Sequence, residues 1–215
     1  MNRDIEKLPQ SEAVFCWFFQ RKRSVMSDRV IFLKGKKVIM RPMNQETDMA
    51  DFQRWINDPE IRRFLTGCMP ISMQQEEKWF DALPDRHGHI ALAIETIEDG
   101  VLIGNMALHN INWISGTAVT GALIGNIEYQ GRGYGTDAKM TLLNYAFNTL
   151  GLRKVCSEVL DFNGRSLRYA AKCGYKEEGR LVQHNLFNGK YYDNVLLAVF
   201  REDWLPLWEK YQLQD

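Results

Sequence analysis

Apolar positions along the chain follow two periods, one typical of strands and one typical of helices. The longest helical pattern lies near the middle, where six apolar residues recur on one face of a helix: Ala138, Leu142, Leu143, Ala146, Phe147 and Leu150. Gly151 follows the last of them, where a helix commonly ends. The pattern predicts a long helix that begins directly after a glycine-rich stretch.

The other segments alternate between the two periods from residue 30 to residue 211. Strands are expected at 37–42, 89–97, 101–113, 118–124, 155–160, 179–187 and 191–200. Further helices are expected at 46–65 with an interruption before Pro59, from Ser72, at 166–173 and at 202–211. Ser72 with Gln75 fits a capping box, and Asn188-Gly189 marks a hairpin turn. The order predicts one α+β domain over residues 29–215.

Residues 1–28 differ from the rest and are interpreted as an N-terminal extension. Their short apolar cluster at 13–19 follows acidic residues and precedes Arg21-Lys22-Arg23, which does not fit a signal peptide. The extension is either a docking helix or a leader upstream of a true start at Met26. In either case we expect residues 1–25 to be dispensable.

Composition narrows the possible partners and compartment. Lys plus Arg equals Asp plus Glu at 27 each, so no net field favours nucleic acid or a membrane surface. Four widely spaced cysteines without Cys-x-x-Cys, and His87 and His89 around Gly88, indicate neither a disulfide framework nor a metal site. No apolar run reaches the roughly 18 residues of a membrane span. A reducing cytoplasm is the simplest expectation.

The stretch 129–137 carries the candidate chemistry, because Gly131, Gly133 and Gly135 alternate on a turn from strand to helix. Glycine allows close approach of a ligand, and the free N–H groups of a helix start suit a pyrophosphate. A Walker A loop is excluded because Gly-Lys-Ser/Thr is absent, and a dinucleotide fingerprint would need glycine where Thr136 stands. The remaining interpretations are Gln-x-x-Gly-x-Gly, starting at Gln130, and a glycine turn without a ligand.

The Gln-x-x-Gly-x-Gly pattern resembles the coenzyme A pyrophosphate loop of the GNAT superfamily of acyltransferases. A second element, Asn163-Gly164-Arg165-Ser166 followed by Lys172-Cys173-Gly174-Tyr175, is similar to the family's Asn-x-x-Ser and Lys-x-Gly-Phe/Tyr motif. Residues 178–181 and 188–193 also resemble the ribosomal-protein N-terminal acetyltransferase branch, the RimJ/RimL type. The resemblance implies the GNAT fold, with a central mixed, mostly antiparallel sheet splayed between its fourth and fifth strands and flanked by helices.

The resemblance also implies acetyl-CoA as a co-substrate and a set of residues that bind it: Leu123, Ile124, Gly125, Gln130, Gly131, Arg132, Gly133, Tyr134, Gly135, Thr136 and Asn163. The amides of 131–136 would hold the pyrophosphate, and the edge of 123–125 would pair with the pantetheine arm. Gly125 is either a bulge or a strand end, and Arg132 either contacts phosphate or is solvated. Asn163 would hold the coenzyme near its pantetheine, and would also serve as a helix N-cap.

Acetyl transfer needs a base, an oxyanion donor and an acid for the leaving thiolate. Spermidine acetyltransferases place a Tyr acid where this chain has Ala170, and Tyr169 is one residue off. The RimJ/RimL pattern places a serine at Ser166, which we assign as the donor or acid. The strand glutamate of relatives is replaced by Thr120. The candidate bases that remain are Glu95, His109, Glu128 and ordered water.

Three functions follow from the resemblance. The first is acetyl transfer to a primary amine at a protein or peptide N-terminus. The second is the same chemistry on a small amine, such as a polyamine, an aminoglycoside or an amino sugar. The third is a module that binds acetyl-CoA without turnover. The aromatic segment from Trp204 to Tyr211 either covers the core or forms a dimer surface, so the chain is expected to be a monomer or a homodimer.

Overall fold

The computed structural model describes residues 30–213 except residues 66 and 68. The segment Phe32–Asp215 forms one compact unit, distinct from Met1–Ile31. The extension expected at residues 1–28 lies outside the described residues. The domain described below is the unit that starts at Phe32.

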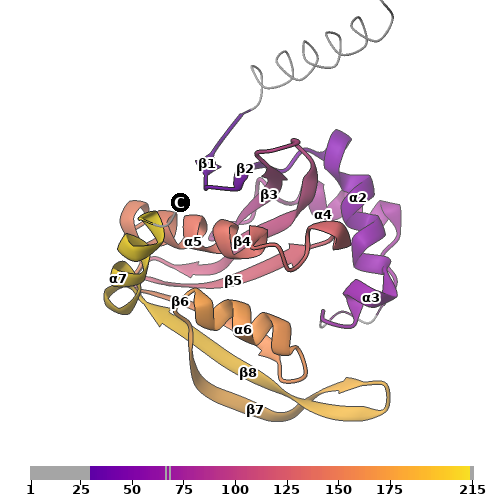
Figure 1. Cartoon of the computed structure of the whole chain (residues 1–215). Coiled ribbons are helices and arrows are strands. Elements are labelled where there is room, and N and C mark those ends of the chain that lie inside the picture. The colour runs from indigo at the N-terminus through magenta and orange to yellow at the C-terminus, as the bar shows by residue number, and fades with distance from the viewer. Residues whose placement is uncertain (1–29, 66, 68, 214–215) are drawn as a thin grey trace, which may run out of the picture. The chain divides into compact units, whose positions relative to one another are not determined.

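An eight-stranded sheet forms the centre of this unit, in the order β1-β2-β3-β4-β5-β6-β8-β7. Its strands are β1 Leu33–Lys34, β2 Val38–Pro42, β3 Ile90–Thr96, β4 Leu102–Asn112, β5 Thr117–Ile124, β6 Lys154–Leu160, β7 Lys176–Phe187 and β8 Lys190–Phe200 (Figure 1). All neighbours are antiparallel except β5 and β6. The predicted mixed, mostly antiparallel sheet is confirmed. β1 was not predicted, because two residues are too short to show a period.

The strands β5 and β6 separate soon after they meet. Their parallel pairing covers only residues Thr117 to Val119 on β5 and Lys154 to Cys156 on β6. Beyond these pairs β5 continues to Ile124 on the ladder with β4, while β6 continues to Leu160 on the ladder with β8. The sheet therefore opens between β5 and β6, which confirms the splay that was expected there.

Helices α2 Gln45–Asn57, α3 Pro59–Arg62 and α4 Met73–Asp81 cover one part of the sheet, on the right in Figure 1. Pro59 stops α2 and opens α3, as the sequence predicts. The capping box of Ser72 and Gln75 at the start of α4 is present. These helices bury a small aromatic and aliphatic cluster of their own around Phe52 and Trp55.

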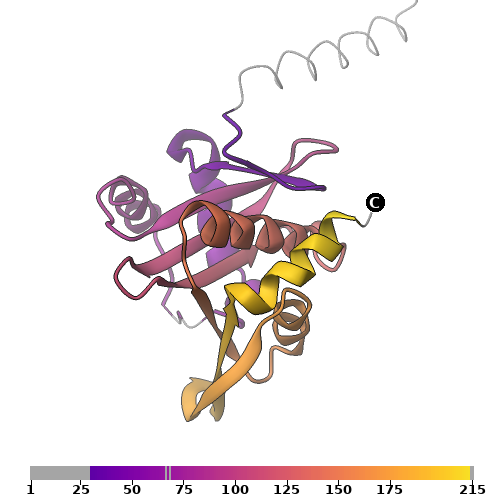
Figure 2. The same ribbon diagram turned by 90° about the vertical axis from the view of Figure 1, so that its left-hand side faces the viewer.

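The main core includes buried side chains of three further helices, α5 Tyr134–Asn144, α6 Gly164–Lys172 and α7 Arg201–Gln212. Figure 2 shows α5 and α7 side by side. The predicted long helix is α5 followed by a π-helical turn, Tyr145–Thr149, in which Leu150 N–H donates to Tyr145 C=O. Gly151 with φ +69° ends it. Trp204 of α7 is fully buried against Phe147, so the aromatic C-terminal segment covers the core.

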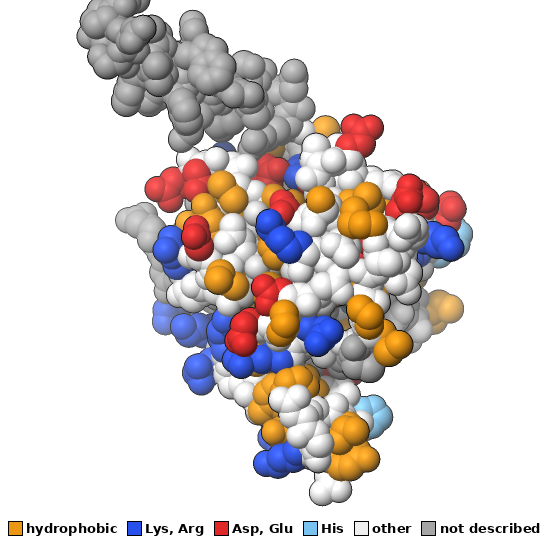
Figure 3. Space-filling model, turned by 90° about the vertical axis from the view of Figure 1, so that its right-hand side faces the viewer, with side chains coloured by type: hydrophobic (Ala, Val, Ile, Leu, Met, Phe, Trp, Pro, Cys, Tyr) orange, Lys and Arg blue, Asp and Glu red, His pale blue; other side chains and the backbone are white. Residues whose placement is uncertain are grey.

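The hairpin of β7 and β8 projects from the sheet and turns at Asn188 and Gly189, both with positive φ. This is the predicted Asn-Gly turn. Exposed apolar side chains lie along the hairpin, including Leu186 at 60% and Tyr191 at 58% exposure. Figure 3 shows such side chains on the projecting lower part of the molecule.

A buried carboxylate fixes the start of α5. Asp137, 1% exposed, accepts hydrogen bonds from the backbone N–H groups of Lys36, Lys37 and Val38 at 2.9, 2.7 and 2.9 Å, and from the Tyr211 hydroxyl. One side chain thus joins the β1–β2 turn, the first turn of α5 and the C-terminal helix.

We expect Asp137→Asn to lower the free energy of unfolding by about 2–4 kcal/mol. Both carboxylate oxygens of Asp137 accept hydrogen bonds, whereas asparagine has one accepting oxygen, so the NH₂ group of asparagine would face buried N–H donors that lose their partner. Tyr211→Phe, which removes one donor only, should cost about 1–2 kcal/mol. Urea unfolding followed by circular dichroism measures both. Asp51→Asn, at a surface ion pair, is the control and should cost about 0–1 kcal/mol. Equal losses in Asp137→Asn and Asp51→Asn would contradict this role.

Candidate functional site

The glycine turn forms a helix start with free backbone donors. Gly131 and Gly133 have φ of +76° and +90°, a region that other residues rarely adopt. Gly133 is the N-cap of α5, and no side chain caps the helix there. Asp137 N–H makes the first intrahelical bond, to Gly133 C=O. The N–H groups of Tyr134, Gly135 and Thr136 in the first turn therefore have no partner within the helix.

Lys37 adds a cation to this turn. Its Nζ donates to the Arg132 carbonyl at 3.1 Å and lies 3.5 Å from the position that a Cβ of Gly133 would take. The Arg132 side chain is exposed, with its guanidinium 6.0 Å from the centroid of the Tyr129 ring. Sequence reasoning missed Lys37, because 95 residues separate it from Arg132 and only the sheet brings the two together.

Gln130 links the two sides of the splayed gap. Its Nε2 donates to the Ile124 carbonyl at the end of β5 at 2.6 Å. Its Oε1 accepts from Arg165 of α6 at 2.5 Å. Gln130 was predicted to flank the coenzyme loop, and it joins β5 to the start of α6.

Side chains bridge the gap where backbone pairing stops. The Thr120 hydroxyl donates to the Cys156 carbonyl at 3.2 Å and lies 3.0 Å from the Tyr175 hydroxyl. Ser157 Oγ reaches the Thr120 carbonyl at 3.4 Å. Beyond Thr120, the edge of β5 that faces β6 carries no ladder, and this edge includes Leu123 and Ile124.

Gly125 follows the end of β5, and its N–H donates to Ile103 C=O at 2.9 Å. Asn126 N–H donates to the same Ile103 carbonyl at 3.1 Å, so two consecutive residues oppose one residue of β4, and both predicted alternatives, a bulge and a strand end, stay open. A Cβ at Gly125 would lie 2.0 Å from the Trp55 ring, so only glycine allows α2 to pack this closely on the strand end. Trp55 is a buried core residue there.

Asn163 and Ser166 form the start of α6. Asn163 is 7% exposed, and its Oδ1 accepts from Ser166 N–H at 3.1 Å, so it serves as the predicted N-cap. Ser166 is half-buried in the first turn, on the same helix start as Arg165, which donates a hydrogen bond to Gln130 beside the glycine turn. The structure thus brings the Asn163–Ser166 element and the glycine turn to opposite sides of one gap.

Tyr169 packs between α5 and α6 beside the buried Lys139. Its ring lies 3.8 Å from the position of a Cβ on Gly135, and its hydroxyl is buried with no partner among the described residues. Lys139 is 2% exposed, with Nζ 5.6 and 5.5 Å from the centroids of the Tyr169 and Tyr175 rings. Burial lowers the pKa of Lys139 to about 8 and raises the pKa of Tyr169 well above 10. Lys139 was assigned to no role from the sequence.

The three candidate bases have different surroundings. Glu95 Oε1 accepts from Arg41 Nε at 2.7 Å within an ion-pair network that includes Asp48. His109 Nδ1 lies 3.0 Å from His89 Nδ1, and burial lowers the pKa of His109 to about 4, which leaves it neutral at pH 7. Glu128 is exposed in the turn Ile127–Tyr129.

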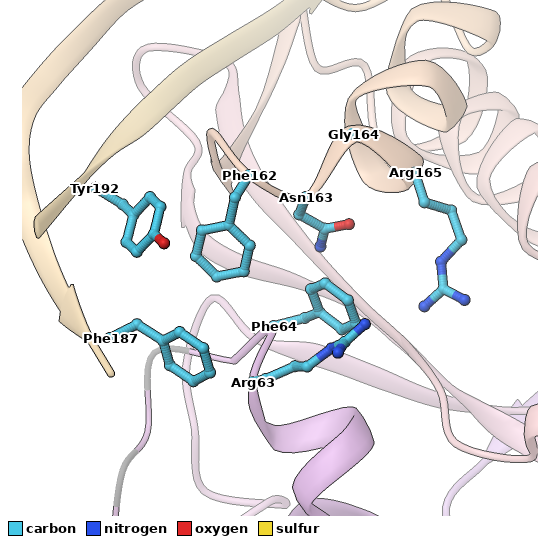
Figure 4. Close-up of a pocket in the computed structure, with 8 residues that line it drawn as sticks. All are labelled: Arg63, Phe64, Phe162, Asn163, Gly164, Arg165, Phe187 and Tyr192. Atoms are coloured by element: carbon cyan, nitrogen blue, oxygen red, sulfur yellow. The ribbon is translucent and has the colours of Figure 1, made fainter. Parts of the chain in front are cut away.

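A pocket of about 300 Å³ opens beside the start of α6 and includes Asn163 and Gly164 in its lining (Figure 4). Four aromatic rings and two arginines supply the rest of the wall: Phe64, Phe162, Phe187, Tyr192, Arg63 and Arg165. No sequence pattern indicates this pocket, because its residues come from three separate segments. Within the described part of the chain, no group of His, Cys, Asp or Glu could hold a metal ion. None of the described helices has the length and apolar character to cross a membrane.

Comparison with known proteins fits this geometry. The family described as Acetyltransferase (GNAT) domain matches residues 37–176, more than half of the chain. The chain therefore belongs to the GNAT acetyltransferase family. As a member of this family it is an acyltransferase that uses acetyl-CoA as the acyl donor.

Its relatives include proteins named for different acceptors. Spermidine N(1)-acetyltransferase of Vibrio cholerae is 32% identical over 104 residues, which cover 48% of this chain and 60% of that enzyme. Human Alpha/beta-tubulin-N-acetyltransferase 9 is 26% identical over 163 residues, covering 67% and 75%. A solved spermidine N-acetyltransferase from Vibrio cholerae, in complex with CoA and spermine, has a TM-score of 0.73 at 24% identity and covers 78% of this chain and 98% of that one. This last likeness shows the shared fold.

Two glycines of the turn give a matched pair of variants for stability. Gly133→Ala should lower the free energy of unfolding by about 1–2 kcal/mol, because alanine at φ +90° is strained. Gly135→Ala should leave stability unchanged or raise it by up to about 1 kcal/mol, because the residue is helical and its Cβ would meet Ile124 at an ordinary 3.6 Å. Thermal unfolding of both variants tests the turn, and equal effects would show that its conformation is not as described.

Proposed function

We propose that this chain transfers the acetyl group of acetyl-CoA to the α-amine of a protein or peptide N-terminus. The observation that carries the proposal is the splayed gap, with the free amides of the α5 start on one side and the Asn163–Ser166 start of α6 on the other. The resemblance of 178–181 and 188–193 to the RimJ/RimL type supports the choice of acceptor.

The coenzyme is proposed to lie across this gap. The amides of 131–136 would bind its pyrophosphate, since a helix start carries partial positive charge and unpaired N–H donors. Lys37 and Arg132 would add positive charge there. The pantetheine arm would follow the edge at Leu123, Ile124 and Gly125, where β6 no longer pairs with β5, with Asn163 on the facing side.

In the chemical step, the neutral acceptor amine attacks the thioester carbonyl, a C–N bond forms and the C–S bond breaks. The Ser166 hydroxyl is proposed to donate a hydrogen bond to the reacting oxygen or the departing thiolate. Glu95 is held by Arg41 and His109 lies against His89, so we assign removal of the amine proton to water, and a proton returns to the departing thiolate to give the free thiol of CoA.

A small polyamine is the second candidate acceptor, because a spermidine acetyltransferase is among the relatives. Ala170 argues against it, since it stands where spermidine acetyltransferases are expected to carry their tyrosine acid. The two arginines of the pocket beside α6 also disfavour a polycation.

Coenzyme binding tests the phosphate side of the site. Lys37→Met should raise the Kd for CoA about tenfold, the loss of one charge-assisted contact of about 1.4 kcal/mol, measured by isothermal titration calorimetry. Lys36→Met is the matched control, because Lys36 Nζ donates to Gln212 C=O and lies away from the turn. The proposal fails if the wild-type protein takes up neither CoA nor acetyl-CoA.

Turnover tests the acceptor and the role of Ser166. Release of free thiol from acetyl-CoA should be fastest with N-terminal peptides and slow with spermidine, an aminoglycoside or glucosamine.

Ser166→Ala should lower kcat at least about tenfold, as expected for loss of a catalytic proton donor. Tyr169→Phe should change it less than about twofold, because that hydroxyl is enclosed. Intact turnover in Ser166→Ala with loss in Tyr169→Phe would overturn the assignment.

A further inference from the structure

The pocket beside α6 lies where an acceptor would approach the reaction centre. It shares Asn163 and Gly164 with the helix start that faces the splayed gap. Its other walls come from the end of α3, from Phe162 and Arg165 at the start of α6, and from the β7–β8 hairpin. A group bound in this pocket can therefore place a neighbouring amine at the gap.

The floor of the pocket is a cluster of aromatic rings around Phe162. The centroid of Phe162 lies 4.6 Å from that of Tyr192, 5.5 Å from Phe187 and 6.2 Å from Phe64. Figure 4 shows these rings facing one another across the pocket. Such a surface suits a flexible chain with apolar stretches. On the hairpin this floor consists of Phe187 and Tyr192, because Leu186 and Tyr191 pair with each other on the opposite face.

Two guanidinium groups give the pocket its charge. The Cζ atoms of Arg63 and Arg165 lie 4.6 and 5.5 Å from the centroid of the Phe64 ring. Arg63 has a weak ion pair with Glu60 at 3.4 Å, and Arg165 has the neutral Gln130 as its hydrogen-bond partner. No Asp or Glu is among the described residues that line the pocket. Asp193, next to Tyr192, is within ion-pair distance of Arg180. The pocket is therefore positively charged.

From this charge and shape we infer the class of acceptor, an inference that rests on the acetyl-transfer function proposed above. The pocket receives a peptide N-terminus that carries Asp or Glu within its first three residues, with the carboxylate at Arg63 and Arg165 and the apolar part of the peptide on the aromatic floor. Guanidinium groups match carboxylates in geometry and charge. They repel polyamines and lysine-rich N-termini, so they also provide discrimination against those substrates.

The test uses three peptides that differ only at positions two and three, which are Glu-Glu, Gln-Gln or Lys-Lys. For the wild-type protein, kcat/KM with the Glu peptide should exceed that with the Lys peptide at least about tenfold, mainly through KM, and the ratio should shrink as salt is added. Arg63→Gln should reduce this ratio several-fold, and Arg63→Gln with Arg165→Gln should nearly abolish it.

Arg54→Gln is the matched control, because Arg54 also forms an i,i+3 ion pair, with Asp51, and does not line the pocket. It should leave the ratio unchanged. An unchanged ratio in the Arg63 variants, or a preference of the wild type for the Lys peptide or spermidine, would overturn the inference. Acetylation of all three peptides at equal rates would refute the inference about the pocket without contradicting the proposed transfer function.

A binding measurement further separates the inference about the pocket from the proposed transfer function. Fluorescence anisotropy of the same peptides, labelled at their C-termini, with CoA-loaded protein reports on the pocket without turnover. Tight binding of the Glu peptide that Arg63→Gln weakens, without thiol release from acetyl-CoA with any amine, would support the pocket and refute the transfer function. Absence of any preference in both assays would refute the pocket.

Discussion

The carboxylate of Asp137 makes the contacts on which the position of the glycine turn depends. It is almost fully buried and receives three backbone N–H groups from the β1–β2 turn and the Tyr211 hydroxyl. A buried charge is tolerated only when such donors surround it. Because the same hydrogen bonds hold the β1–β2 turn, they also bring Lys37 to the Arg132 carbonyl. The shape and the charge of the turn therefore have one cause.

The second constraint is the short pairing of β5 with β6. A sheet that opens must satisfy its edges in another way, and here side chains do so at the base of the gap, where Thr120 reaches Cys156 and Tyr175. At its other end Gln130 connects Ile124 to Arg165. The gap is thus closed by side chains at both ends and has an unpaired strand edge between them, which is the feature an extended ligand can use.

The local elements could be predicted from the sequence, whereas the contacts between distant segments could not. Three local features were predicted correctly: the helix break at Pro59, the capping box at Ser72 and the Asn188-Gly189 turn. Each depends on residues only a few positions apart, so a single sequence is enough to recognise it. The order of strands and the splay came from the family resemblance. The roles of Lys37 and Asp137 and the pocket around Phe162 depend on residues that only the fold brings together. The burial of Lys139 could not be predicted for another reason: a charged side chain is expected in solvent, whereas the structure buries this one.

The positive charge of the proposed acceptor pocket bears on how the acceptor amine could lose its proton. Glu95 is held by Arg41, and His109 is paired with His89 and stays neutral at pH 7 with its pKa near 4. An acceptor ammonium bound near Arg63 and Arg165 would have its pKa lowered by the repulsion between like charges. A carboxylate on the same acceptor would compensate for the cost of binding there, since it would pair with the guanidinium groups while the amine reaches the gap. The arginines would then select the acceptor and favour its neutral, nucleophilic form, so that water suffices to take up the proton.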